Sequence, residues 1–343
     1  MASLGVSKSP GTKSRPALTA QATPSAGHRF GHGHVPVMLE EVLAALDVRS
    51  GGDYLDATFG AGGYTRAILE AGAGRVFAID RDPAAAARAR ELAADSPGLI
   101  VLEGHFGAMA ELLAPHGIHR LDGIVLDLGV SSMQLSDPSR GFSFAADGPL
   151  DMRMSRQGDS AAAVVNRADA RTLSAILRQY GEEPAAGRIA RAIVARRAKA
   201  PIERTRELAE LVAGVVGRRG GRIDPATRTF QALRIYVNDE QGELERGLEA
   251  AEALLGPGGR LVVVAFHSLE DRMVKRFLAA RSDALPRPSR HLPMPSAPSA
   301  AARWRLLSKR PLRPQPAEIA RNPRARSARL RWAERAATVA PAA

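Results

Sequence analysis

Residues 54–63 read YLDATFGAGG, an apolar run that ends in a glycine-rich turn. The apolar part predicts a buried strand over residues 54–58, and a helix is predicted from Thr65. Glycine in such a turn lets the backbone approach a ligand closely at the N-terminus of the following helix. This order of strand, turn and helix is typical of the first unit of an α/β fold. We therefore expect a ligand at this end of the strand.

Strand and helix signals alternate on both sides of this unit. A short helix is predicted at 36–46, and an alanine-rich helix follows from Pro83. The predicted strands are residues 54–58, 76–80, 99–102, 123–128, 261–266, 304–307 and 328–332. A glycine-rich turn at 256–259 precedes the fifth strand. The alternation predicts a doubly wound, mostly parallel sheet with helices on both faces.

A long segment without strand signals interrupts the alternation between the fourth and fifth strands. Within residues 137–235, apolar stripes predict only helices. Asp224 is predicted to cap the last of these, whose stripe continues past Gly242 to Leu255. Ser268 is predicted to cap the helix that follows the fifth strand.

These signals divide the chain into four parts. They are a disordered N-terminal extension at 1–30, a discontinuous cofactor-binding domain at 31–136 and 236–335, an inserted helical substrate-recognition domain at 137–235, and a tail at 336–343. The extension is rich in Ser, Thr, Pro and Ala and has no acidic residue. It fits an organellar transit peptide or a disordered bacterial extension, and the lack of an amphipathic period favours the second.

The charge balance of the chain is basic. Its 343 residues include 48 Lys and Arg against 36 Asp and Glu, a formal net charge of +12. Such a surface concentrates a polyanion such as RNA or an acidic membrane, although a GC-rich genome that favours arginine gives the same balance. Arg191, Arg196 and Arg197, in a predicted helix of the insert, are candidate contacts to RNA phosphates.

Two absences narrow the class of protein further. The chain contains no cysteine, which excludes a disulfide scaffold and a thiolate metal site. It contains no apolar run of about 18 residues, so no membrane span is expected. No group of His, Asp and Glu has the spacing of metal ligands, and no metal is expected.

Two acids lie in or at the end of the first two predicted strands. Asp80 follows Gly60 by 20 residues, and an acid at that place suits the two hydroxyls of an adenosine ribose. A dinucleotide-binding fingerprint requires glycine where Thr65 stands. Asp56 precedes Gly60, where an acid suits the ammonium and sulfonium charges of S-adenosylmethionine (SAM). The residues therefore favour SAM over a dinucleotide, with a tight turn and a capping acid as the structural alternative.

Asp127 ends the fourth predicted strand, at the edge where ligands bind in open α/β sheets. Its carboxylate is placed to align an exocyclic amine as a hydrogen-bond acceptor, to contact the cofactor, or to brace the loop. His267 follows the fifth strand and is the second catalytic candidate, with packing at the strand end as the alternative. Phe106 lies past the third strand, where it either covers the adenine ring or belongs to the core.

Longer motifs resemble the MraW (RsmH) family, the methyltransferases H of small-subunit ribosomal RNA. The resemblance extends from about His34 to Arg335. The matching motifs are HVPVM (34–38), DATFGAGG (56–63), AIDRDP (78–83), DLGVSS (127–132), RGFSF (140–144), DGPLDMRM (147–154), TRTFQALR (227–234), FHSLEDR (266–272) and NPRARS (322–327). So many long matches in the same order make the resemblance specific.

This resemblance implies a class I SAM-dependent methyltransferase, with a Rossmann-like, doubly wound, mostly parallel sheet and an inserted helical domain. It implies methyl transfer to the exocyclic N4 amine of a decoding-centre cytidine in the 16S rRNA of the small ribosomal subunit. It further implies an enzyme of the bacterial cytoplasm, with neither DNA nor a membrane as partner. The residues carry no indication of an oligomeric state.

The resemblance also assigns site residues by motif position. The implied SAM contacts are Gly62, Gly63, Tyr64, Asp80, Phe106, Asp127 and Gln134. Tyr64 stands where histidine is common in the family, so a backbone contact would survive the change more readily than a side-chain contact. Met133 stands where proline is usual, which alters the loop that leads to Gln134.

Three other classes of protein share some of these features. A DNA cytosine-N4 methyltransferase uses similar chemistry but usually carries a Ser-Pro-Pro-aromatic motif, which residues 127–130 lack. A dehydrogenase is disfavoured by Thr65. A non-catalytic RNA-binding protein has no need for a glycine-rich turn paired with Asp80.

Overall fold

The structure is a computed structural model that describes residues 36–217, 224–282 and 302–337. A seven-stranded sheet has the order β3-β2-β1-β4-β5-β7-β6. Its strands are β1 (Asp53–Asp56), β2 (Arg75–Asp80), β3 (Leu99–Glu103), β4 (Leu121–Asp127), β5 (Leu255–Ala265), β6 (Trp304–Leu306) and β7 (Arg329–Arg335). Strands β1 to β5 are parallel, and β7 is antiparallel to both of its neighbours. The predicted doubly wound, mostly parallel sheet is therefore confirmed, whereas the predicted extension at 1–30 lies outside the described residues.

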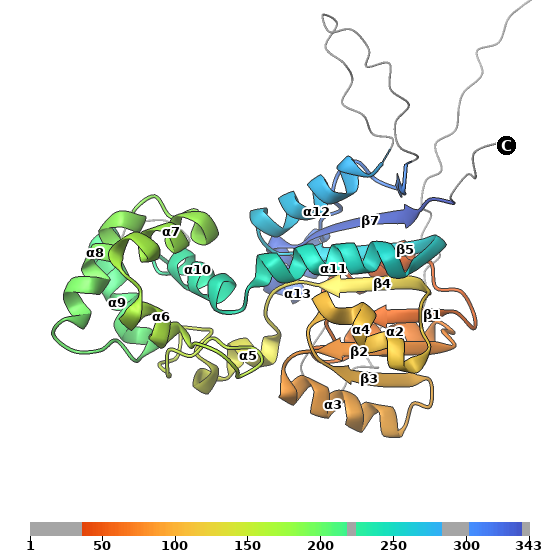
Figure 1. Ribbon diagram of the computed structural model, residues 1–343, viewed down its shortest axis with the longest axis horizontal. Coiled ribbons are helices and arrows are strands. Elements are labelled where there is room, and N and C mark those ends of the chain that lie inside the picture. The colour runs from red at the N-terminus through yellow and green to blue at the C-terminus, as the bar shows by residue number, and fades with distance from the viewer. Residues whose placement is uncertain (1–35, 218–223, 283–301, 338–343) are drawn as a thin grey trace, which may run out of the picture. The chain divides into compact units, whose positions relative to one another are not determined.

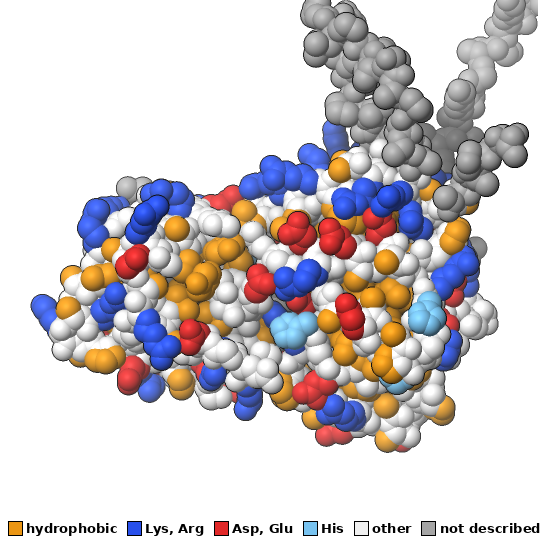
Figure 2. All heavy atoms as spheres, viewed as in Figure 1, with side chains coloured by type: hydrophobic (Ala, Val, Ile, Leu, Met, Phe, Trp, Pro, Cys, Tyr) orange, Lys and Arg blue, Asp and Glu red, His pale blue; other side chains and the backbone are white. Residues whose placement is uncertain are grey.

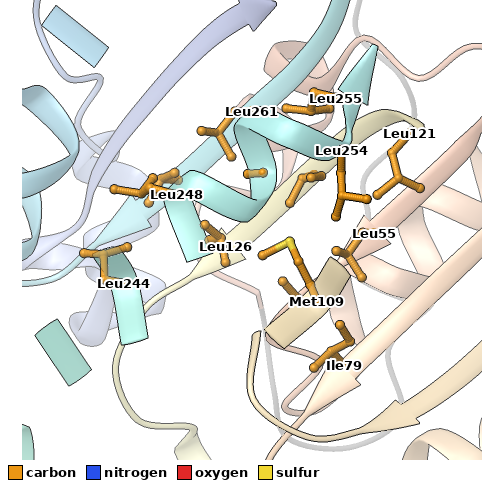
Figure 3. Packing of buried hydrophobic residues seen from close by; sticks show 14 of the residues in the cluster. Leu55, Ile79, Met109, Leu121, Leu126, Leu244, Leu248, Leu254, Leu255 and Leu261 are labelled. Carbon is orange, nitrogen blue, oxygen red and sulfur yellow. The ribbon is translucent and has the colours of Figure 1, made fainter. Parts of the chain in front are cut away.

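Helices cover both faces of this sheet (Figure 1). They are α1 (Leu39–Leu46), α2 (Gly63–Glu70), α3 (Pro83–Ala94), α4 (Met109–Leu113), α11 (Glu240–Leu254), α12 (Ser268–Ala280) and α13 (Pro316–Arg321). Because successive strand residues point to opposite faces, Leu55 packs with α4 and α11, as Figure 3 shows. Its neighbour Tyr54 packs with α1 and α2 on the other face. An apolar cluster thus lies on each face of the sheet.

The segment between β4 and β5 has a hydrophobic core of its own. Its helices before α11 are α5 (Ser132–Ser136), α6 (Ala161–Arg167), α7 (Ala170–Gly181), α8 (Ala186–Arg197), α9 (Thr205–Val216) and α10 (Thr227–Val237). Leu173, Ile189, Leu208 and Phe230 bring four of these helices together in one buried cluster. In its described part the segment forms no strand, as predicted. The predicted boundary at 235 falls inside α10, and the domain limits stay a prediction.

Two helix starts differ from the predicted ones. Helix α12 is capped by His267 together with Glu270, not by Ser268. The Ser268 hydroxyl instead donates to Glu182 at 2.9 Å. Helix α10 begins at Thr227 rather than directly after Asp224. The Ser268 side chain is engaged by the distant Glu182, and the Asp224 side chain accepts from the nearby Ala226 N–H instead of capping α10.

The predicted long helix through Gly242 is also wrong, because the chain breaks between α10 and α11. Asp239 adopts a φ of 46° at this break. The side chain of Asn238 fixes the break by donating to the Met152 carbonyl at 2.7 Å and accepting from the Met154 N–H at 2.8 Å. These partners are more than 80 residues away, so no local pattern indicates the break. The turn predicted at 256–259 lies within β5, where the pairing with β4 shifts register.

The topology places three acids at one edge of the sheet. The chain leaves β1 toward β2 and β3, then returns to the opposite side of β1 with β4. The crevice at such a switch point is where ligands bind in open α/β sheets. Asp56, Asp80 and Asp127 end β1, β2 and β4 at this carboxyl edge. No helix in the described residues is long and apolar enough to cross a membrane.

Candidate active site

The turn after β1 brings backbone N–H groups to the carboxyl edge. Gly60 and Gly62 have φ values of 54° and 78°, which glycine adopts without strain. A Cβ on Gly62 would lie 2.6 Å from the ring of Phe59. A Cβ on Gly63 would lie 2.1 Å from Pro36. Since α2 begins at Gly63, its first N–H groups have no partner within the helix, and the turn presents them to a ligand.

Asp80 holds this turn in place from the end of β2. Its Oδ2 accepts from the Gly60 N–H at 2.8 Å, and its Oδ1 accepts from the Asp82 N–H at 2.8 Å. Burial raises the pKa of Asp80, while these two hydrogen bonds act in the opposite direction. Each carboxylate oxygen keeps a second lone pair. The ribose contact of Asp80 stays a prediction, and the carboxylate has bracing of the turn as a further role.

Asp127 ends β4 with a buried oxygen, Oδ1, that has no hydrogen-bond partner among the described residues. Its backbone N–H donates to Thr58 Oγ1 at 2.7 Å, which joins the ends of β4 and β1. Burial, together with the charges of Asp56 and Glu270, raises the pKa of Asp127 well above its ordinary value. A buried acceptor without a donor costs free energy. This oxygen is therefore suited to a ligand that brings a donor or a positive charge.

Asp56 lies fully buried beneath the turn. Its Oδ2 accepts from the Thr65 hydroxyl at 2.7 Å, and its Oδ1 accepts from the Thr58 N–H at 3.2 Å. Burial nevertheless raises the pKa of Asp56 to about 6. Thr65, which stands in place of the third glycine of a dinucleotide fingerprint, thus serves the acid that precedes the turn.

The acids of this edge fit a cationic cofactor. The pKa values of Asp56 and Asp127 are both raised, and neighbouring carboxylates contribute to both shifts. An opposite charge within about 4–6 Å would favour their ionised forms. SAM carries such a charge on its ammonium and sulfonium groups, whereas the pyrophosphate of a dinucleotide would add negative charge. The residues present therefore fit SAM.

The two aromatic candidates are packed within the protein. Tyr64 is buried, and its hydroxyl donates to the Val37 carbonyl. The ring of Phe106 packs on Gly247 of α11, where a Cβ would lie 2.5 Å from it. At Tyr64 this leaves the backbone for a cofactor contact, which the departure from histidine does not affect. Phe106 is half-buried, and its contact with adenine stays a prediction.

Gln134 connects the loop after β4 to the start of α3. Its side-chain oxygen accepts from the Ser131 N–H at 2.9 Å, and its side-chain nitrogen donates to Asp82 Oδ2 at 2.8 Å. Arg140 donates to the same Asp82 oxygen at 2.7 Å. Burial opposes ionisation of Asp82, but the bonds from Gln134 and Arg140 prevail and lower its pKa. The Gln134 side chain thus braces the loop, and its predicted cofactor contact remains untested.

His267 lies at the same edge, between β5 and α12. Its Nε2 is buried and forms an ion-pair contact of 3.0 Å with Glu270 Oε1, without a hydrogen bond to any described residue. Glu270 also accepts from the Phe266 N–H at 2.8 Å. Burial opposes ionisation of Glu270, but the charges of His267 and Arg234 prevail and lower its pKa. His267 therefore belongs to a network that continues into the insert.

Glu240 completes a group whose ligand atoms would suit a metal ion. Oxygens of Glu240 and Glu270 and a nitrogen of His267 all lie within 4.8 Å of one another. The sequence spacing does not reveal this group, because Glu240 comes from α11. Arg234 donates two hydrogen bonds to Glu240, at 2.7 and 2.8 Å. We attribute the group to this ion-pair network, in which the guanidinium supplies the positive charge.

Sequence reasoning missed several residues that position the site. Asp82 and Arg140 lie in the motifs AIDRDP and RGFSF, but nothing in the spacing indicates that they pair across 58 residues. Glu270 follows His267 at the spacing of a capping box, a signal that was available. Thr58 accepts from the Asp127 N–H at the end of β4, and Thr65 donates to Asp56 at the end of β1, so both contacts depend on the tertiary fold.

The sheet order, the glycine turn after β1 and the acids that end β2 and β4 together define a class I SAM-dependent methyltransferase. A model of the MraW methylase family matches residues 31–336. The chain belongs to this family, and it uses SAM as its methyl donor.

Two relatives are similar over nearly the whole chain. "Ribosomal RNA small subunit methyltransferase H" of Paramagnetospirillum magneticum is 59% identical over 310 residues, which cover 90% of this chain and 97% of that protein. The protein of the same name from Rhodospirillum centenum is 62% identical, covering 90% of this chain and 93% of that protein. A solved rRNA methylase from Streptococcus thermophilus covers 88% of this chain and 95% of that one, at 11% identity and a TM-score of 0.35.

Proposed function

We propose that this enzyme transfers a methyl group from SAM to the exocyclic N4 amine of a decoding-centre cytidine in 16S rRNA, within the bacterial cytoplasm. The observation that carries the rRNA substrate is the identity of 59% and 62%, over 90% of the chain, with two proteins named for that reaction class. The motif resemblance supports the choice of a cytidine amine. The partner is then the small ribosomal subunit or its RNA.

The chemistry of an amine acceptor suits the environment of Asp127. The lone pair of an exocyclic amine is conjugated with the ring and must be turned out of its plane before it can attack. Bound SAM supplies an electrophilic methyl carbon and a positive charge. An ionised Asp127 accepts an N–H of the amine through Oδ1, which is otherwise unpartnered, and so aligns the nitrogen. After transfer the nitrogen releases one proton, for which Asp127 is an acceptor at this edge.

His267 is the second proposed catalytic residue, which contacts the RNA or takes up a proton. Its buried Nε2 lies 3.0 Å from Glu270 Oε1, and its Nδ1 accepts from the Glu270 N–H at 3.5 Å, so Glu270 orients the ring through both nitrogens. A base held by a third group is the arrangement expected of a proton-transfer residue. Its alternative role is to end β5 and begin α12.

Nucleoside digestion of 16S rRNA followed by mass spectrometry tests this proposal. RNA treated with the wild-type enzyme should contain N4-methylcytidine, and RNA treated with Asp127→Asn should contain little or none. Asp122→Asn is the matched control, since Asp122 lies near the opposite end of β4 and, among the described residues, accepts from the Asp53 N–H. Finding 5-methylcytidine, a ribose methyl group or a methylated purine as the product would falsify the proposal.

A further inference from the structure

The connection between β6 and β7, residues 307–328, contains six cations and one acid. We call it the basic connection. All six cations are exposed, and within the described residues none of their side chains makes an ion pair or a hydrogen bond. They are Lys309, Arg310, Arg313, Arg321, Arg324 and Arg326. This stretch includes the motif NPRARS, to which neither the cofactor site nor the acceptor site assigns a role.

Among the residues that the structure describes, the arginines that directly follow the basic connection are paired with an acid of the protein, unlike the six cations within it. Glu318, the one acid, accepts from the Met38 N–H at 2.7 Å and forms no ion pair with a cation of the described residues. Arg329 and Arg331, directly after the connection, both bond to Asp271, at 3.0 and 2.6 Å. Unpaired cations close together in one short segment repel one another, and this repulsion lowers the stability of the folded state. They are therefore best explained by an external anion.

The fold places the basic connection at the carboxyl edge. Because β6 is antiparallel to β7, and β7 is antiparallel to β5, the chain between β6 and β7 passes the edge at which β5 ends. Leu312 exchanges two backbone hydrogen bonds with Leu330, which faces Val264 near the end of β5. Ala325 is buried in the cluster that contains Val125 of β4. The label α13 in Figure 1 marks the middle of this segment.

We propose that the basic connection binds phosphates of the RNA substrate and holds the acceptor nucleotide beside Asp127. This inference rests on the function proposed above and adds a second RNA-binding surface to that of the insert. Guanidinium groups suit phosphate because their planar donors bind its oxygens in pairs. An anionic membrane fits less well, because a membrane-binding segment needs an apolar face. Among the large hydrophobic residues of the connection, Leu312 alone is exposed.

The insert is less suited to be the whole RNA-binding surface. On the face shown in Figure 2, Lys and Arg side chains over the insert lie among Asp and Glu side chains and form no continuous basic surface. Arg196 pairs with Glu207, and Arg197 donates to the carbonyls of Val165 and Ala168. Two of the three arginines predicted to hold RNA are thus engaged within the protein.

The test compares two variants that each lose two exposed cations from the full-length enzyme. Arg324→Gln with Arg326→Gln removes charge from the basic connection. Arg49→Gln with Arg120→Gln removes the same charge just before β1 and near the start of β4, at the opposite edge. Binding to 16S rRNA is measured over a range of salt concentrations, and SAM affinity and thermal unfolding report whether the fold is intact.

The first variant should bind 16S rRNA about tenfold or more weakly, with a salt slope lowered by roughly 0.7–0.9 for each lost contact. Its SAM affinity should stay unchanged, and the control variant should keep the wild-type slope. Equal effects of both variants, or none, would overturn the inference, as would lost binding to anionic vesicles with RNA binding retained. If wild-type enzyme makes no methylcytidine in 16S rRNA, the proposed function fails instead, independently of these slopes.

Discussion

At the scale of single residues, Asp80 shows that one carboxylate can serve the fold and the ligand together. It accepts two backbone N–H groups, from Gly60 and Asp82, and keeps one lone pair on each oxygen. We expect Asp80→Ala to weaken SAM binding about tenfold to hundredfold, since hydrogen bonds to a charged group contribute roughly 1.5–3 kcal/mol. Titration calorimetry measures this. Asp80→Asn is the control that keeps the bond to one N–H, and unchanged SAM affinity in a folded Asp80→Ala enzyme would contradict the assignment.

Asp56 is a fully buried acid whose ionisation is opposed by burial. Its pKa is raised from about 3.8 to about 6 in the folded protein. Between these values the folded state still binds a proton that the unfolded state has lost, so the contribution of Asp56 to stability falls as pH rises from about 4 to 6. Above this window Asp56 costs about 3 kcal/mol of unfolding free energy, by the usual conversion of pKa units.

Urea unfolding of the SAM-free enzyme at several pH values checks this expectation. The wild type should lose about 2–3 kcal/mol of stability relative to Asp56→Asn between pH 4 and pH 7. Saturating SAM should reduce that loss, because a nearby cation lowers the pKa of the acid. A stability difference that stays constant across this range would show that Asp56 ionises as easily as in the unfolded chain.

At the scale of secondary-structure elements, the sequence predicted β1 to β4 well because each carries a short apolar run. The ends of β1, β2 and β4 were predicted within two residues, and those ends position Asp56, Asp80 and Asp127. Helix boundaries were predicted poorly where a distant group decides them. Asn238 ends α10 through bonds to Met152 and Met154, and the side chain of Gln134 is engaged by Asp82 from 52 residues away. Such partners are determined by the tertiary fold and leave no periodic signal.

Helix α8 shows how the charges of one element divide between structure and ligand. Arg197 donates to two carbonyls at the end of α6, at 2.7 and 2.6 Å. Arg191 is exposed and, within the described residues, has no such partner. We therefore expect Arg197→Gln to lower the unfolding free energy by about 1–2 kcal/mol with little effect on RNA binding.

Arg191→Gln is the matched variant on the same helix. It should leave thermal unfolding unchanged and lower the salt slope of RNA binding by about one, as expected when a phosphate contact is lost. If Arg191→Gln keeps the wild-type slope, the exposed face of α8 is simply solvated. The insert would then contribute to RNA binding through other residues.

At the scale of the whole molecule, polar links join the insert to the sheet close to the proposed site. Arg140 bonds to Asp82 at the start of α3, and Arg81 donates to the Asn238 carbonyl at 2.8 Å. Glu182 of the insert accepts from Ser268, the first residue of α12. The hydrogen bonds of Arg81 and Asp82 lie next to Asp80, and that of Ser268 lies next to His267. The loop that follows Asp127 leads directly into the insert. We expect these links to keep a substrate bound by the insert in register with the acids at the strand ends.

The absence of cysteine from the entire chain also decides which cytosine chemistry is open to it. Methylation of ring carbon five normally begins with a cysteine thiolate that adds to ring carbon six, and this chain has no such nucleophile. Transfer to the exocyclic amine needs only alignment, an acceptor such as Asp127 and a bound methyl donor. We therefore expect RNA that contains 5-fluorocytidine, which traps carbon-five enzymes covalently, to be methylated on its amine without forming an adduct. Denaturing electrophoresis with a cysteine-dependent methyltransferase as positive control measures this. A protein–RNA band that survives denaturation would mean that another side chain attacks the ring, and transfer to the amine would have to be abandoned.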